Sequence, residues 1–279
     1  MTRAMAFDKT HATFAANRAV GRVALTVATL DGRSRRARVR EQGSLRVRFP
    51  HGDGEALDAV LVNTAGGIAG GDRFDIAVTV GEGARLTVTT AAAEKVYRAP
   101  ETEAAIGVTL TVAAGGKLAW LPQETILFDG VNLRRTIDVD LADGASLLLA
   151  EAVIFGRSAM GEAVDRGHFI DRWRVRRAGQ LAFAETVRLD GAIAQQLAAS
   201  AVAKGGVAVA TVLAIPGDDS AVAAVRAITD NFAGEVGASA WNGLAVVRLC
   251  ARDGAALRRD LVSVLTTLGG APLPRLWLN

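Results

Sequence analysis

Three glutamates recur at comparable places in a repeated pattern and are the strongest candidates for chemistry in this chain. Glu124, Glu151 and Glu185 each follow a leucine-led apolar segment with few compensating charges. A carboxylate inside such a segment costs free energy unless it is paired or bound to a cation. Two interpretations stay open: arginines pair with these acids, or the acids line a polar path along which a hydrated divalent cation passes without being held tightly. The arginines expected as partners are Arg98, Arg134, Arg157, Arg174 and Arg188.

A glycine cluster at residues 66–72 (GGIAGGD) resembles a phosphate-binding loop in composition only. No Gly-Lys-Ser/Thr follows it, and it lacks the Gly-x-Gly-x-x-Gly order of a dinucleotide site. We therefore expect a loop where the backbone approaches another segment closely. Asp72 would then bond backbone amides or present its carboxylate.

Other catalytic or metal-binding patterns are weak. His11, His51 and His168 are far apart and lack the spacing of a zinc site. There is no Gly-x-Ser-x-Gly motif, and the apolar neighbours of Cys250 favour a buried, inert thiol. A single cysteine allows no intrachain disulfide, which fits a reducing compartment. We therefore expect that this chain is not an enzyme.

Alternating apolar stretches from about residue 20 to residue 215, each closed by a glycine turn, predict β-strands. Leu86, Leu118, Leu147 and Leu181 each follow such a turn at similar spacing. This weak repeat favours a mainly β fold, a layered, β-helix-like stack of strands.

Two α-helices are expected to pack on this stack in the C-terminal region. The first, at about 219–233, can be capped by a residue at 218–220, and the second, at about 254–268, stops at a Gly-Gly pair. Residues 244–250 between them predict a buried strand. The tail at 271–279 is apolar and contains two prolines, so we expect it to be tied down on the protein or on a partner.

Composition limits the class of protein. The 279 residues are 50% hydrophobic but only 5% aromatic, and we expect a single domain spanning 1–279. Lys+Arg 32 against Asp+Glu 29 is too balanced to indicate nucleic-acid binding, and the basic run at 33–40 predicts a solvated hairpin. A charged N-terminus and the lack of a long apolar run predict a soluble, cytoplasmic protein that does not enter a membrane.

Seven blocks in order resemble the urease accessory protein UreD family, also called UreH. The most diagnostic block is 118–130 (LAWLPQETILFDG). The sequence departs from the family at residues 63–65 (NTA), where a more proline-rich lead is expected, and residues 203–243 are generic. The other blocks are 43–48 (GSLRVR), 61–72 (LVNTAGGIAGGD), 89–98 (TTAAAEKVYR), 155–162 (FGRSAMGE), 185–191 (ETVRLDG) and 274–277 (PRLW).

The resemblance implies a non-enzymatic scaffold for urease maturation with a β-rich, helix-like stack of strands and a pair of helices. It implies binding to urease apoprotein and to the accessory protein UreF, which recruits the GTPase UreG. Nickel released on GTP hydrolysis would travel through the complex to the urease site, so nickel is expected in transit, with no tightly bound cofactor.

On this basis the candidate nickel path contains Asp72, Glu124, Glu151 and Glu185, with Asp129 as an addition. The expected partner surface includes residues 155–162 and the C-terminal tail. Two alternatives stay open: a structural adaptor in which the glutamates are salt-bridged and no metal enters, and a β-solenoid carbohydrate-active enzyme. The low aromatic content argues against the second.

Overall fold

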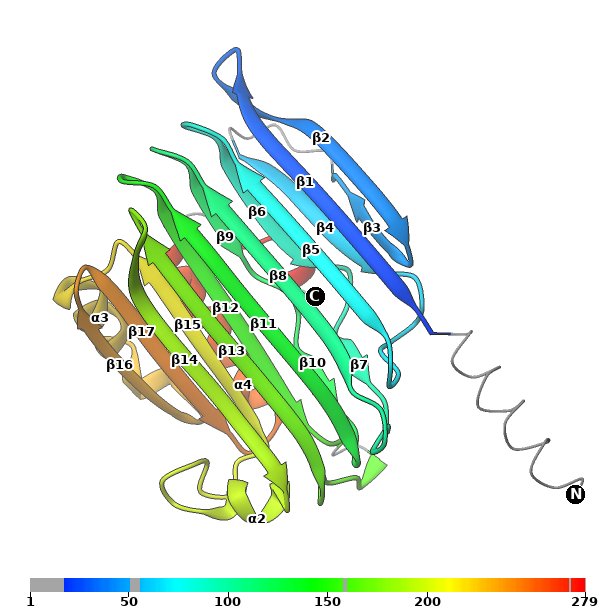
Figure 1. Cartoon of the computed structure of the whole chain (residues 1–279). Coiled ribbons are helices and arrows are strands. Elements are labelled where there is room, and N and C mark those ends of the chain that lie inside the picture. Colours follow the sequence, from blue (N-terminus) through cyan, green and yellow to red (C-terminus); the bar gives the residue numbers. More distant parts are fainter. Residues whose placement is uncertain (1–17, 51–55, 158–159, 271, 279) are drawn as a thin grey trace, which may run out of the picture.

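Two β-sheets face each other across the main core of the protein (Figure 1). The computed structural model describes residues 18–50, 56–157, 160–270 and 272–278. His11 and His51 lie outside these ranges. Sheet A contains, in spatial order, β14 (Gln180–Gly191), β13 (Gly167–Arg177), β11 (Val131–Leu141), β8 (Ala104–Val112), β5 (Arg73–Val80), β1 (Val20–Leu30) and β2 (Arg33–Gly43).

Sheet B lies behind sheet A in the view of Figure 1. Its spatial order is β16 (Glu235–Trp241), β17 (Leu244–Ala251), β15 (Ala208–Ile215), β12 (Ser146–Phe155), β9 (Lys117–Trp120), β6 (Arg85–Thr90), β4 (Leu57–Asn63) and β3 (Leu45–Arg48). The short strand β10 (Thr125–Leu127) pairs with β12 and with β7 (Glu94–Val96).

The central strands form the predicted layered stack. From β4 to β13 the chain passes repeatedly between the sheets, and neighbouring strands within each sheet run parallel. Leu118 pairs in register with Leu86 on one side and Leu147 on the other. The mainly β, β-helix-like prediction is therefore confirmed.

Leu181 does not belong to this ladder, contrary to the expectation. It lies near the start of β14 in sheet A and is 56% exposed, whereas the other three leucines lie in sheet B and are buried. The reason is that β14 returns antiparallel to β13 through a hairpin, so the fourth repeat does not form another layer.

Two helices cover the outer face of sheet B, as predicted. α4 (Gly254–Gly269) is capped by Asp253 and buries Leu257, Leu261 and Leu265 against that sheet. α3 (Asp219–Arg226) is capped by Asp218, whose carboxylate accepts backbone N–H bonds at 2.9 and 3.2 Å.

The first helix is shorter than the expected 219–233. The Thr229 hydroxyl donates to the Arg226 carbonyl at 2.6 Å, in place of a continuing helical N–H. The chain then forms a 3₁₀ turn, η2 (Thr229–Asn231), and enters β16. Neither β16 nor α2 (Ile193–Ala198) was predicted from the sequence.

The C-terminal tail is tied to the protein itself. In η3 (Arg275–Trp277), the Trp277 indole is 2% exposed and donates to the Leu121 carbonyl at 3.0 Å. Arg258 of α4 donates to the carbonyls of Leu276 and Trp277. Among the four described ranges of the chain, no helix is both long and apolar enough to cross a membrane.

Candidate functional site

A buried arginine joins two carboxylates in the space between the sheets. Arg135 in β11 lies directly opposite Asp171 in the parallel neighbour β13. Its Nε and Nη2 donate to the two oxygens of Asp171 at 3.1 and 2.6 Å. Nη1 donates to Glu151, which comes from β12 of the facing sheet. These three residues, here called the triad, are buried.

Further hydrogen bonds fix the two acids. The indole N–H of Trp120 donates to Glu151 at 2.9 Å, and that of Trp173 donates to Asp171 at 3.1 Å. Buried carboxylates need such donors because they have lost their hydration. The acids are thus held in fixed positions by residues of both sheets.

The triad carries an excess negative charge when both acids are ionised, because one guanidinium faces two carboxylates. Burial raises the pKa of Glu151 to about 6, with Asp171 adding to the rise while Arg135 and Trp120 oppose it. Burial lowers the pKa of Arg135, but Asp171 and Glu151 outweigh it, so the net pKa is above the usual value. The protonated form of Glu151 is therefore more favoured here than it is for a carboxyl group in water.

A small cavity of about 40 Å³ lies against the triad. This volume is sufficient for about one water molecule. Glu185 of β14 and Thr211 of β15 also line it. Thr211 lies directly opposite Glu151 in the antiparallel pair β12–β15.

The small cavity adjoins a larger hollow of about 510 Å³ between β14 and the strands β15 to β17. The two share five lining residues, among them Glu185 and Thr211, so they meet at these side chains. The hollow is otherwise largely apolar. The two adjoining volumes, here together called the passage, extend from the β14–β16 end of the molecule to the triad.

Glu185 stands where the passage narrows. Arg248 of β17 donates to both its oxygens at 3.1 and 2.9 Å. Burial raises the pKa of Glu185, Arg248 lowers it and Asp171 raises it further. The Arg248 side chain is itself half exposed, so this ion pair lies between the inner cavity and solvent.

Glu124 does not line this passage. Its carboxylate accepts from Arg258 of α4 at 2.8 Å, on the outer side of sheet B. The following residue, Thr125, points inward and accepts from Arg135 at 3.3 Å, as expected for neighbours that alternate sides. Glu124 therefore holds α4 and the tail in place. The sequence comparison placed Glu124 in register with Glu151, but the two side chains lie on opposite sides of sheet B.

Asp72 also lies elsewhere. Its oxygens accept the backbone N–H groups of Ala19 and Ala69, both at 2.8 Å, which confirms the expected bonding to amides. Asp129, the further candidate, pairs with Arg98 at 3.3 Å at the surface. The structure thus brings Glu151 and Glu185 together and separates Asp72, Glu124 and Asp129 from them.

The expected arginine partners were wrong, although the expectation of ion pairs was right. Arg135, Arg248 and Arg258 pair with the three glutamates. Among the arginines expected, Arg174 donates to the backbone carbonyl of Glu185 at 3.2 Å. The others pair with acids outside the set: Arg98 with Asp129, Arg134 with Glu103, Arg157 with Glu162 and Arg188 with Asp190.

An acid beside the glycine loop, Glu94 of β7, was missed by the sequence interpretation. Burial raises the pKa of Glu94 to about 7, although Asn63 donates to it at 3.2 Å, and Asp72 adds to the rise. Gly67 adopts φ 139°, and a Cβ there would lie 2.5 Å from Tyr97. The loop is thus held closely against β7, which confirms the predicted close backbone approach.

The remaining metal-binding candidates are isolated. His168 Nδ1 lies 2.8 Å from Asp190. The Cys250 thiol is half-buried, donates to the Ala203 carbonyl at 3.3 Å, and has its pKa raised by burial. Over the part of the chain that the structure describes, no three His, Cys, Asp or Glu side chains gather in a way that could hold a metal ion.

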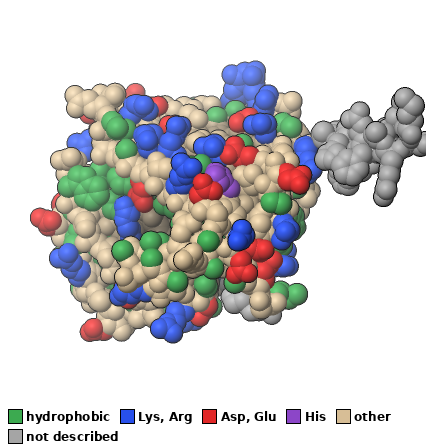
Figure 2. All heavy atoms as spheres, turned by 60° about the horizontal axis from the view of Figure 1, so that its bottom comes forward, with side chains coloured by type: hydrophobic (Ala, Val, Ile, Leu, Met, Phe, Trp, Pro, Cys, Tyr) green, Lys and Arg blue, Asp and Glu red, His purple; other side chains and the backbone are tan. Residues whose placement is uncertain are grey.

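These features define a β-helical fold with a buried, charged triad at the inner end of the passage, and they show no preformed metal centre among the described residues. Figure 2 shows basic and acidic side chains interspersed on the face that lies at the bottom of Figure 1. The model of the family described as UreD urease accessory protein matches residues 19–278. The chain belongs to this family.

Relatives support this assignment over nearly the whole chain. A urease accessory protein UreD of Rhodopseudomonas palustris (strain HaA2) is 60% identical over 96% of this chain and 96% of the relative. The protein of the same name from Bradyrhizobium diazoefficiens is 56% identical over 97% of this chain and 98% of the relative. Each alignment covers nearly all of this chain and nearly all of the relative.

Proposed function

We propose that this chain is a scaffold for urease maturation that binds urease apoprotein and UreF, and through UreF the GTPase UreG, and along which nickel passes. Family membership supports the role in urease maturation. The passage past Glu185 to the triad is the single observation that carries the nickel step. Nickel is cargo in this proposal, so weak oxygen ligands are an advantage.

The chemistry of the passage suits a cation in transit. The excess negative charge of the triad attracts a cation, while Arg135 prevents both carboxylates from closing on it as ligands. Glu185 adds a further oxygen site at the narrow point. A hydrated Ni²⁺ is larger than the 40 Å³ cavity, so passage requires loss of water or movement of Arg248 and Thr211.

Urease activation in cells that express the urease genes and all accessory genes tests this function. Glu151→Gln combined with Glu185→Gln should lower urease activity at limiting nickel while the variant still co-purifies with UreF. Glu124→Gln is the matched control, because Glu124 lies outside the passage, and it should activate normally. Normal activation by the double variant would contradict the nickel step.

A structural adaptor without metal contact is a second candidate. The observation that favours it is that each of the three glutamates already has an arginine partner. If the double variant loses urease activation only in proportion to its loss of UreF or urease binding, this second function is correct.

A further inference from the structure

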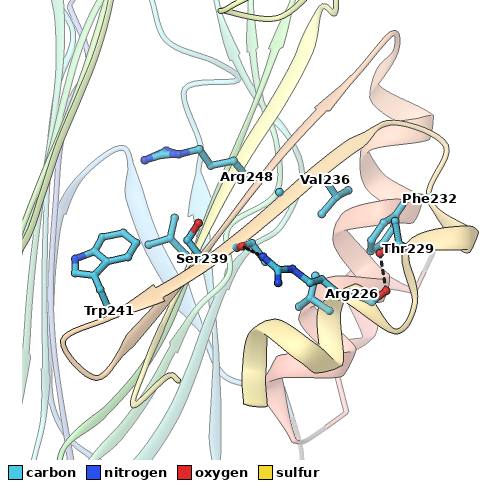
Figure 3. Close-up of a pocket in the computed structure, with 11 residues that line it drawn as sticks. Arg226, Thr229, Phe232, Val236, Ser239, Trp241 and Arg248 are labelled. Atoms are coloured by element: carbon cyan, nitrogen blue, oxygen red, sulfur yellow. Dashed lines mark hydrogen bonds between the residues drawn. The ribbon is translucent and has the colours of Figure 1, made fainter. Parts of the chain in front are cut away.

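The free edge of β16 forms the floor of a groove of about 530 Å³ (Figure 3). Within the described residues, β16 pairs with β17 on one side and with no strand on the other. Phe232 and Val236 lie on one side of the strand, and Trp241 and Arg248 on the other. The groove therefore wraps around an unpaired strand edge.

The turn between β16 and β17 fixes which backbone groups face the groove. Asn242 and Gly243 have φ 51° and 75°, and Trp241 pairs with Leu244, as in a two-residue hairpin. The pair that closes such a turn is hydrogen-bonded, and the pattern then alternates. The N–H and C=O groups of Val236, Ala238 and Ala240 therefore point away from β17.

A side chain occupies part of this edge in the structure. Arg226 of α3 donates from Nη2 to the Ala238 carbonyl at 3.3 Å. This is the kind of bond that an N–H of an added strand would make. Because the arginine side chain is long and exposed to solvent, a strand can replace it at small cost.

The charge of the groove favours an acidic occupant. Arg226 and Arg248 are its only charged lining residues among the described part of the chain. Arg248 lies opposite Gly237, and a Cβ added at Gly237 meets nothing within 4 Å. This open position leaves a route across β16 from an added strand to the Arg248 guanidinium. A second copy of this groove would instead bring its own Arg226 and Arg248 towards those of the first, so like charges would meet.

The geometry points to this groove as the docking site for an extended, acidic segment of a partner protein, which adds to β16 as a strand and bonds Arg248 through a carboxylate. Strand addition supplies affinity through backbone bonds, and the side chains supply specificity. Arg248 also holds Glu185, so the incoming carboxylate competes with Glu185 for the same guanidinium. Docking thereby frees Glu185 at the narrow point of the passage; this last step rests on the proposed function, whereas the docking does not.

Fluorescence anisotropy of the full chain with an end-blocked, labelled octapeptide of alternating Val and Glu tests the docking. The same peptide with Lys in place of Glu is the matched probe. We expect the Glu peptide to bind at least about tenfold more tightly. Equal binding of the two peptides would overturn the proposal.

Variants of the chain locate the site. Gly237→Val suits a strand and meets no neighbour, so the fold is retained while the route to Arg248 is filled. Gly237→Val and Arg248→Ala should each weaken binding about tenfold. Arg172→Ala, on the outer face of sheet A, is the matched control and should bind as the parent chain does. Unchanged binding by Gly237→Val would contradict docking at β16.

Glu185→Gln distinguishes the competition from simple docking. Because the amide holds Arg248 less strongly than the carboxylate, this variant should bind the Glu peptide several-fold more tightly. Unchanged affinity would remove the competition. Sedimentation that shows a dimer abolished by Gly237→Val would make a second copy the occupant and overturn the acidic partner. These measurements use no nickel or urease, so they succeed or fail independently of the proposed function.

Discussion

Arg135 and Asp171 lie opposite each other in neighbouring parallel strands and share two N–H···O bonds, while the same guanidinium reaches Glu151 in the facing sheet. One arginine therefore links sheet A to sheet B in the interior of the stack. Since the triad is buried, the loss of Arg135 would leave two carboxylates without their counter-charge.

Replacing this arginine should be strongly destabilising. Arg135→Met leaves two uncompensated buried carboxylates, so we expect the free energy of unfolding to fall by about 3–5 kcal/mol. Urea denaturation at about pH 7.5, which is above the ordinary pKa range of carboxyl groups, measures this change. Arg134→Met, at the exposed neighbouring position, should change it by less than about 1 kcal/mol. A loss no larger than that of the control would show that the triad is not a structural link.

The Glu151 carboxyl should make stability fall as pH rises. Its pKa is raised to about 6 in the folded chain, above its ordinary value of 4.5, so the folded state binds more protons between these values. The stabilisation from this group is fully present below the ordinary pKa of 4.5. It is lost as the pH rises through the folded-state pKa of about 6, and the loss amounts to roughly 2 kcal/mol. Glu151→Gln should lack this decrease when unfolding free energies of the two chains are compared across the window. Parallel curves would contradict the raised pKa.

Glu94, in β7 beside the glycine loop, should give the stability a second, separate dependence on pH. Glu94 has a pKa raised to about 7 from 4.5, so its ionised form opposes folding above neutrality. We expect Glu94→Gln to raise the unfolding free energy by about 1–3 kcal/mol above pH 8 or so, and to have little effect near the lower pKa. The variant amide can still accept from Asn63. A loss of stability above neutrality would mean that the carboxylate is needed there.

The tail should contribute to stability through one residue. Trp277→Ala removes a 2%-exposed side chain and its bond to the Leu121 carbonyl, so we expect a loss of about 3–5 kcal/mol in thermal or urea unfolding. Leu278→Ala, at a 67%-exposed side chain, is the control and should change stability by less than about 0.5 kcal/mol. Similar effects of both variants would show that the tail does not pack as described.

Regular features of the fold could be predicted from the sequence because they depend on local patterns. The Leu86, Leu118 and Leu147 ladder follows from turn glycines with φ 64°, 65° and 73°, which only glycine adopts readily. The buried stripe and Gly-Gly stop of α4 are equally local. Such signals fix strand layers and helix ends without knowledge of the partners in space.

The site could be predicted only in part, because ion pairing is not local. Glu151 and Glu185 were identified, but Arg135 and Arg248 reach them from other strands, and nothing in the sequence spacing indicates those pairs. Glu124 was misplaced because residues 121–124 leave the regular strand between β9 and β10, so counting from Leu118 no longer gives the direction of the side chain. The edge strand β16 was missed because small residues there give a weak alternation.

The most direct test of the nickel path is the nickel content of urease matured with a steric block at Thr211. Thr211→Leu enlarges a side chain where the hollow meets the inner cavity, without removing any carboxylate, and Thr211→Val is the matched control of nearly unchanged size. Urease would be purified from cells expressing each variant, and nickel per active site measured by mass spectrometry. We predict nickel well below the parent level with Thr211→Leu and normal nickel with Thr211→Val, while both variants bind UreF. Full nickel content with Thr211→Leu would contradict passage of nickel through this protein.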